Sequence, residues 1–290
     1  MLSFDVIIAG LAIGSMYGLL ALGYHITHIV SNTVNFSQGA SLMLGAVVAY
    51  TLHVTWGLPL PVAAGGTLII CAAVGLFVHR VVVAPFSKNG SIAWLMSTIA
   101  FGIVLENAVM LTFGKESRSM PSPLPDTPIS VLGASIYPIE IVVPIVGLGC
   151  AVALALFLKK TLLGKALLAA AQNRDAAMLQ GIAVSQLISI AYMVSTSMAG
   201  IAGMLIAPKL NVYAGMGTMF GLKAFAVAII GGMDSAVGIM VAGLLYGLAE
   251  AAIASVLPSA YREIIGFGFV IVVLAIKPQG LFGRIAAQKV

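Results

Sequence analysis

The sequence predicts an all-α integral membrane protein, a bundle of about eight or nine transmembrane helices that includes short or broken ones. Hydrophobic residues make up 61% of the 290 residues and charged residues only 8%, whereas soluble domains carry roughly 25% charged residues. Apolar stretches of about 20 residues, the length that crosses ~30 Å of hydrocarbon, recur along the chain. The basic residues gather in a few of the intervening loops.

This composition excludes several classes of protein. A globular core of this length could not bury so many apolar side chains, so a cytosolic enzyme, a secreted disulfide scaffold and a nucleic-acid-binding domain are ruled out. The two cysteines, Cys71 and Cys150, lie in apolar stretches, which indicates buried thiols rather than a disulfide framework. His25 and His28 lack partners at metal-ligand spacing, so we expect no metal site. We expect residues 1–290 to form one transmembrane domain.

The predicted spans follow in chain order, each justified by its length and apolar composition. They are residues 6–28, 37–56, 60–79, 91–113, 138–158, 184–206, 217–232, 236–257 and 262–277. The seventh is short and contains Gly231-Gly232, which indicates a half-span or a re-entrant helix. We expect the first not to be a cleaved signal peptide, because Asp5 precedes it and no Lys or Arg occurs before Arg80. Abundant glycine favours close helix contacts.

The basic residues predict the orientation. Nine of the 14 positive charges fall in three regions that we expect to face the cytoplasm, at Arg80, Lys88, Lys159, Lys160, Lys165, Arg174, Lys277, Arg284 and Lys289. The opposite side keeps Lys115, Arg118, Lys209 and Arg262, while Lys223 is placed at the edge of a span. The positive-inside rule then puts the N-terminus outside and the C-terminus inside, with an odd number of crossings. Nine spans satisfy this parity, whereas eight require one stretch only to dip into the membrane.

The connection at residues 159–183 is the most informative loop. Its Ala, Leu, Gln, Arg and Met residues favour helix, and we expect a break near Gln172-Asn173 followed by a short helix with Asp175 near its start. Gly181 can end that helix in a left-handed conformation. Met178 and Leu179 cannot be buried across a thin loop. From these residues alone, docking onto a soluble partner and resting on the inner membrane surface both stay open.

Two carboxyl groups lie deep within predicted spans, Glu106 in the fourth and Glu250 in the eighth. Such residues face a bundle interior or an aqueous cavity. We expect a structural role for both, with Asn107 and Ser255 as hydrogen-bond partners. Proton coupling requires a chain of ionisable groups, so a proton-driven carrier is disfavoured.

Two stretches look alike, residues 35–46 at the start of the second span and residues 232–243 at the start of the eighth. Each places an amide or carboxylate, a hydroxyl and glycines before an apolar helix. Paired Gly-interrupted segments point to a central substrate region, although a chain rich in Gly, Ser and Ala also yields such matches by coincidence. The candidates for a translocation pathway are therefore Asn35, Ser37, Gln38, Asp234 and Ser235.

Motifs for energy use are absent from the sequence. Gly164-Lys165 is followed by Ala166 and lacks the spacing of a phosphate-binding loop, and no run resembles a carbonyl-lined ion filter. We therefore predict no catalytic residue and no cofactor bound by this chain. If ATP drives transport, ATP and Mg²⁺ bind to partner ATPase subunits.

Five stretches carry a resemblance to a known family. They are GSMYGLLALG at 14–23, VNFSQG at 34–39, AQNRDAA at 171–177 with Gly181-Ile182, FAVAIIGGM at 225–233 and KPQGLFG at 277–283. In this order they resemble the LivH-type permease subunits of bacterial ABC importers for branched-chain amino acids, over nearly the whole chain.

The resemblance implies a multi-pass permease subunit of the bacterial inner (cytoplasmic) membrane. It implies a LivM-like second permease subunit, two ABC ATPase subunits, a periplasmic substrate-binding protein and the lipid bilayer as partners, and no nucleic acid. It also implies that residues 159–183 form a cytoplasmic coupling segment that docks on an ATPase. The coupling residues would be Gln172, Asn173, Arg174, Asp175, Met178, Leu179 and Gly181.

The sequence departs from the family pattern at three positions near the expected pathway. Gln38 stands where His is usual, Ala40 where Glu is usual, and Asp234 where Gly is frequent. The substrate therefore stays open among branched-chain amino acids, urea, short amides and aromatic acids. A stand-alone secondary carrier or channel is the competing class. A membrane scaffold is disfavoured, because no sizeable soluble domain is visible.

Overall fold

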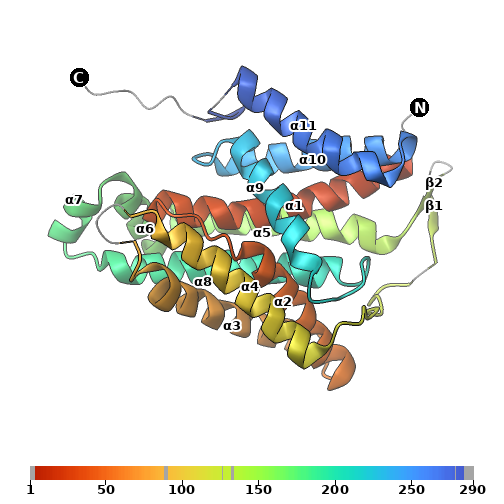
Figure 1. Ribbon diagram of the computed structural model, residues 1–290, viewed down its shortest axis with the longest axis horizontal. Helices are drawn as coiled ribbons and strands as arrows, with labels where there is room; N and C mark the ends of the chain where they lie inside the picture. The colour runs from red at the N-terminus through yellow and green to blue at the C-terminus, as the bar shows by residue number, and fades with distance from the viewer. Residues whose placement is uncertain (1–3, 88–90, 126, 132–133, 278, 284–290) are drawn as a thin grey trace.

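The computed structural model describes residues 4–87, 91–125, 127–131, 134–277 and 279–283, which are almost entirely helical (Figure 1). The elements in chain order are α1 (Phe4–Ser31), α2 (Gln38–Tyr50), the π-helical turn η1 (Thr51–Thr55), α3 (Leu60–Phe77), the π-helical turn η2 (Val78–Val83), α4 (Ala93–Phe113), β1 (Ile129–Val131), β2 (Ala134–Ile136), α5 (Pro138–Lys160), α6 (Leu162–Gln172), α7 (Arg174–Leu179), α8 (Val184–Ile206), α9 (Met216–Gly231), α10 (Ala236–Val256) and α11 (Ser259–Ile276). Lys88, Arg284 and Lys289, whose charges contribute to the predicted orientation, lie outside the described residues. The side chain of Arg262 is also not described.

Every stretch predicted as a span coincides with a helix in the described residues. Those that are long and apolar enough to cross a membrane are α1, α3 with η2, α4, α5, α8 and α10, six in all within these residues. The seventh predicted span corresponds to α9, which has only 16 residues and ends at Gly231. Gly232 follows with φ of +87°, a conformation that glycine adopts without strain. The sequence-based expectation of a short seventh segment is confirmed.

The helices run mostly along the long axis of the molecule, and α9 crosses them steeply (Figure 1). The hairpin of β1 and β2 and the N-terminal end of α1 lie at one end, which we call the hairpin end. Helix α7 lies at the other, which we call the α7 end. Helix α1 packs against α5, α8, α9 and α10 and is the most buried of the candidate spans, whereas α4 is the least buried.

Several close helix contacts occur where both helices carry glycine. A Cβ atom on Gly14 of α1 would lie 2.6 Å from the carbonyl oxygen of Gly243 on α10, which is closer than real contacts allow. On α2, a Cβ on Gly45 would lie 2.4 Å from the Cα of Gly200 on α8. Lipid supplies little hydrophobic drive for helix association, so small residues that allow close backbone approach provide the van der Waals contact. These glycines fix the spacing of the bundle.

Replacing Gly14 by Ala is expected to destabilise the protein by about 1–3 kcal/mol, because the added methyl group meets backbone atoms that cannot move aside. The matched control is Gly149→Ala on α5, where an added Cβ meets nothing within 4 Å. Thermal unfolding of the purified variants in detergent measures the difference. Equal melting temperatures for the two variants would contradict the proposed role of the glycine contact.

Candidate functional site

The connection between α5 and α8 folds as its local chemistry predicts. The hydroxyl of Thr161 accepts a hydrogen bond from the first turn of α6, and α6 ends at Gln172. Asn173 breaks the helix with φ of −156° and caps α7 through its side-chain oxygen, which accepts a backbone N–H at 3.0 Å. Asp175 lies in the first turn of α7, and Gly181 has φ of +79°. The predicted break and the left-handed glycine are both confirmed.

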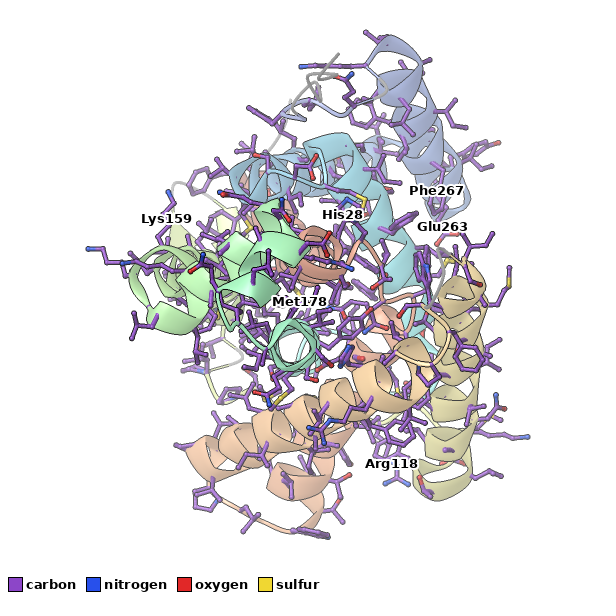
Figure 2. The ribbon with its side chains drawn as sticks, turned by 90° about the vertical axis from the view of Figure 1, so that its left-hand side faces the viewer. His28, Arg118, Lys159, Met178, Glu263 and Phe267 are labelled. Atoms are coloured by element: carbon purple, nitrogen blue, oxygen red, sulfur yellow. The ribbon has the colours of Figure 1, made fainter. Side chains whose placement is uncertain are left out.

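Helix α7 presents apolar side chains outward. Met178 is 54% exposed and Leu179 is 87% exposed, while Ala177 between them and the bundle is buried. Figure 2 looks onto this end of the molecule, with Met178 toward the viewer. Adjacent exposed apolar side chains suit contact with a partner or with a membrane surface.

Arg174 connects this segment to the centre of the bundle. Its guanidinium donates a hydrogen bond to the backbone carbonyl of Val30 in the last turn of α1, at 2.9 Å. The final carbonyls of a helix have no partner within it, and a cation there is favoured by the helix dipole. This bond joins α7 directly to the end of α1.

Two short helices, α2 and α9, meet at their N-terminal ends in the interior. A Cβ on Gly39 of α2 would lie 2.3 Å from the carbonyl oxygen of Gly217 on α9. The predicted pathway residues Asn35, Ser37 and Gln38 surround this crossing and are fully buried. The Ser37 hydroxyl donates to Asn35 Oδ1 at 2.6 Å, and the Gln38 amide donates to the Ser195 carbonyl of α8 at 2.9 Å. These bonds hold the start of α2 against α8.

The other predicted pathway residues lie in the turn before α10. Ser235 caps α10 by accepting the Gly238 N–H at 3.1 Å. Asp234 has a side chain that is 60% exposed and lies 3.9 Å from His28 Nε2 of α1. No hydrogen bond among the described residues joins this turn to Asn35, Ser37 or Gln38. The structure therefore forms two separate polar groups from the two similar stretches.

A cavity of about 300 Å³ lies between α2, α4 and α9. Phe36, which lies two residues before α2, and Gly39 and Ala40 of its first turn contribute to the walls, whereas the buried polar residues of the same stretch do not line the cavity. Glu106 of α4 also lines this cavity, and its carboxylate accepts a hydrogen bond from Thr218 Oγ1 of α9 at 3.1 Å. Thr218 was not predicted as a site residue, because a lone threonine on an apolar helix has no sequence motif around it that indicates a role.

Glu250 is paired with Lys223, another residue that the sequence did not assign to the interior. The Lys223 ammonium donates to Glu250 Oε1 at 2.8 Å, and the two residues are 7% and 6% exposed. The expected partners Asn107 and Ser255 are wrong, because each donates to a backbone carbonyl of its own helix. Helical Ser and Asn side chains readily make such local bonds. The ion pair supports the structural role predicted for Glu250.

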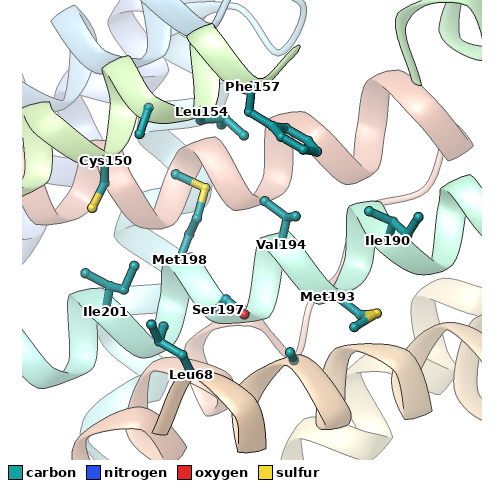
Figure 3. Close-up of a pocket in the computed structure, with 12 residues that line it drawn as sticks. Leu68, Cys150, Leu154, Phe157, Ile190, Met193, Val194, Ser197, Met198 and Ile201 are labelled. Atoms are coloured by element: carbon teal, nitrogen blue, oxygen red, sulfur yellow. The ribbon is translucent and has the colours of Figure 1, made fainter. Parts of the chain in front are cut away.

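A larger cavity of about 480 Å³ lies between α3, α5 and α8, and Figure 3 shows it. Leu154 and Phe157 extend from α5, opposite Val194 and Met198 of α8. Its lining is apolar apart from the hydroxyl of Ser197 and the thiol of Cys150, and it includes no charged side chain. Such a surface suits hydrocarbon chains and offers nothing that recognises a charged solute.

An apolar bundle with two short helices meeting in its interior, and with an exposed helical segment anchored to its central helix, defines a multi-pass membrane permease. The family described as branched-chain amino acid transport system / permease component matches residues 6–274, and the chain belongs to this family. It is a multi-pass inner-membrane permease.

Relatives match over nearly the whole chain. The high-affinity branched-chain amino acid transport system permease protein BraD of Pseudomonas aeruginosa is 32% identical over 98% of this chain and 97% of its own length. The protein LivH of Escherichia coli, which has the same descriptive name, is 32% identical over 97% of this chain and 96% of its own. A probable branched-chain amino acid permease of Methanocaldococcus jannaschii is 29% identical over 91% of this chain and 88% of its own.

Replacing Lys223 by Met is expected to destabilise the protein by about 3–5 kcal/mol, because it leaves the Glu250 carboxylate buried without a counter-charge. The double variant Lys223→Met/Glu250→Leu removes both charges and should recover most of that loss. Thermal unfolding in detergent checks both values. A double variant as unstable as the single one would show that the pair itself does not account for the effect.

Proposed function

We propose that this chain is the permease subunit of an ABC importer that moves branched-chain amino acids across the inner membrane. The observation that carries the proposal is the exposed helix α7, which is anchored to the central helix through Arg174. A permease driven by a separate motor needs such a contact. The full-length relatives named for branched-chain amino acid transport support the choice of substrate.

In this proposal the α7 end faces the cytoplasm, with the N-terminus outside, the C-terminus inside and nine crossings, three of them by the shorter helices α2, α9 and α11. The distribution of charge supports this orientation. Lys159, Lys160 and Lys165 lie in the connection of residues 159–183 at the α7 end. Lys115 and Lys209 lie in other loops, which follow α4 and α8. A bias of this kind is what the positive-inside rule requires.

We assign ATP binding and hydrolysis to other chains. This sequence lacks a phosphate-binding loop, so ATP and Mg²⁺ would bind to two ABC ATPase subunits. We propose that residues 159–183 dock on one of them, through Gln172, Asn173, Arg174, Asp175, Met178, Leu179 and Gly181. A LivM-like second permease subunit would complete the pathway, and a periplasmic substrate-binding protein would deliver the amino acid. Membership of a multi-component transport family supports these partners.

Transport would proceed by switching between two arrangements of the helices. Docked ATPases differ in shape between nucleotide states, and a bound partner shifts such an equilibrium only through its different affinities for the two arrangements. Asn35, Ser37 and Gln38 would act on the pathway by fixing the first turn of α2, since all three are buried. Asp234 and Ser235 would lie at its inner mouth.

Co-expression and reconstitution test this function. When the chain is produced with its partner subunits, we expect the ATPases to co-purify with it. We also expect proteoliposomes of the complex to take up leucine only with ATP inside and the binding protein outside. Uptake by this chain alone, driven by an ion gradient, would contradict the proposal and indicate a secondary carrier. Uptake of urea, short amides or aromatic acids instead of leucine would correct the substrate.

Replacing Arg174 by Glu is expected to reduce ATP-dependent uptake by about tenfold or more, because it removes a charge-assisted hydrogen bond and places a negative charge against the carbonyl end of α1. Membrane insertion should be unaffected. The matched charge reversal Lys115→Glu lies in the exposed loop after α4 and should leave uptake unchanged. Unchanged uptake and unchanged ATPase association in Arg174→Glu would count against the coupling role.

A further inference from the structure

Among the described residues that line the cavity between α2, α4 and α9 there is a carboxylate but no cation. Its walls are mainly apolar or small, and Glu106 is the one charged residue among them. A neighbouring cavity lined by Lys209, Lys223 and Glu250 contains cations beside its carboxylate. In the ion pairs formed by the described residues, Glu106 is not a member. Its partner is the neutral hydroxyl of Thr218.

This arrangement contrasts with that of Glu250. Both carboxylates lie in helices that are long and apolar enough to cross the membrane. Glu250 is neutralised by Lys223 inside the bundle, whereas Glu106 lies at the cavity without a cation. An unpaired carboxylate at this depth is costly in free energy. A cation that enters the cavity from outside the chain would offset that cost.

The depth of Glu106 suits a solute arriving from the hairpin end. Glu106 precedes the end of α4 at Phe113 by seven residues, which is about 10 Å at 1.5 Å per residue. One turn closer to the N-terminal end of α4, Gly102 approaches Ser37. A Cβ atom on Gly102 would lie 3.5 Å from the Ser37 Cα. The carboxylate is therefore nearer to the hairpin end than the point at which α4 and the start of α2 come together.

The remaining surfaces of the cavity match the other parts of an amino acid. Phe36 and Phe225 pack against each other with ring centroids 5.0 Å apart, and both line the cavity. Ile99, Ile103 and Leu222 extend this apolar wall. The first turns of α2 and α9 make no side-chain capping bond. The Glu106 carboxylate already lies beside the first turn of α9, so the N-terminal dipole of α2 is the one that can attract a further anionic group.

We propose that this cavity is a transient binding site for a zwitterionic amino acid with an aliphatic side chain. The substrate ammonium group binds the Glu106 carboxylate, the aliphatic side chain lies against Phe36 and Phe225, and the substrate carboxylate faces the first turn of α2. Glu106 thereby selects for a free amino group. This inference rests on the proposed function, because it assigns one step of amino-acid uptake to a particular part of the chain.

Uptake kinetics in the reconstituted complex provide the first test, with leucine as the probe. Glu106→Gln should lower the maximal rate of ATP-dependent leucine uptake by about tenfold, since it removes a charge-assisted hydrogen bond, and Glu106→Asp should lower it less. The control Glu116→Gln makes the same chemical change at an exposed loop position and should leave the rate unchanged. Nucleotide-dependent association with the ATPases should be the same in all variants.

Protection from labelling provides a second test that does not depend on the folding of the Glu106 variants. Ile103 lines the cavity and is 56% exposed, so Ile103→Cys can be labelled with a maleimide after Cys71 and Cys150 are replaced by Ala. In the assembled transporter, leucine-loaded binding protein should slow labelling roughly threefold relative to empty binding protein, because occupancy protects the thiol. Adding Glu106→Gln should abolish this protection.

The outcomes separate the two proposals. Failure of the wild-type complex to take up leucine refutes the proposed function. Normal leucine uptake by the wild type together with an unchanged maximal rate in Glu106→Gln overturns the binding site and leaves the function standing. If Glu106→Gln does not assemble, the labelling of Ile103→Cys in a chain that keeps Glu106 tests the binding site instead. Equal labelling rates with loaded and with empty binding protein would then overturn the site.

Discussion

Backbone contact at glycine is the constraint on which the rest of this structure depends. Between helices in lipid there is little hydrophobic drive, and association depends on how closely the backbones approach. Gly14 and Gly243 bring α1 against α10, Gly45 and Gly200 bring α2 against α8, and Gly39 meets Gly217 where α2 and α9 start. Each of these contacts would be lost with any side chain larger than hydrogen. The short helices keep their positions because these contacts fix their neighbours.

The same contacts connect the exposed segment to the interior. Arg174 ties α7 to the last turn of α1, and α1 packs along α10, α8, α5 and α9. These contacts form a continuous path from α7 through α1 to the crossing of α2 and α9. Figure 1 shows that α1 runs from the α7 end to the hairpin end through the middle of the bundle. A separate motor could thus act on the interior without any soluble domain in this chain.

The features that the sequence predicted are those set by local chemistry. The helical stretches follow from apolar length, and the break at Asn173 and the turn at Gly181 follow from the conformations that these residues favour near helix ends. The pairing of Lys223 with Glu250, and the position of Glu106 beside Thr218, depend on how α9 crosses the other helices. That crossing has no signature within any single stretch. For the same reason, the similarity of the two polar stretches did not indicate that Asp234 lies apart from Gln38.

The sidedness of α7 tests most directly whether a separate cytosolic motor acts on this helix. Leu179 is 87% exposed, so Leu179→Cys can be labelled by a membrane-impermeant maleimide in a background with Cys71 and Cys150 replaced by Ala. When the chain is produced without the ATPase subunits, which would otherwise cover Leu179, we expect labelling in inside-out vesicles and none in intact spheroplasts, with the reverse pattern for Lys115→Cys in the loop after α4. Labelling of Leu179→Cys from the external face would contradict the orientation, the coupling role of α7 and the proposed motor together.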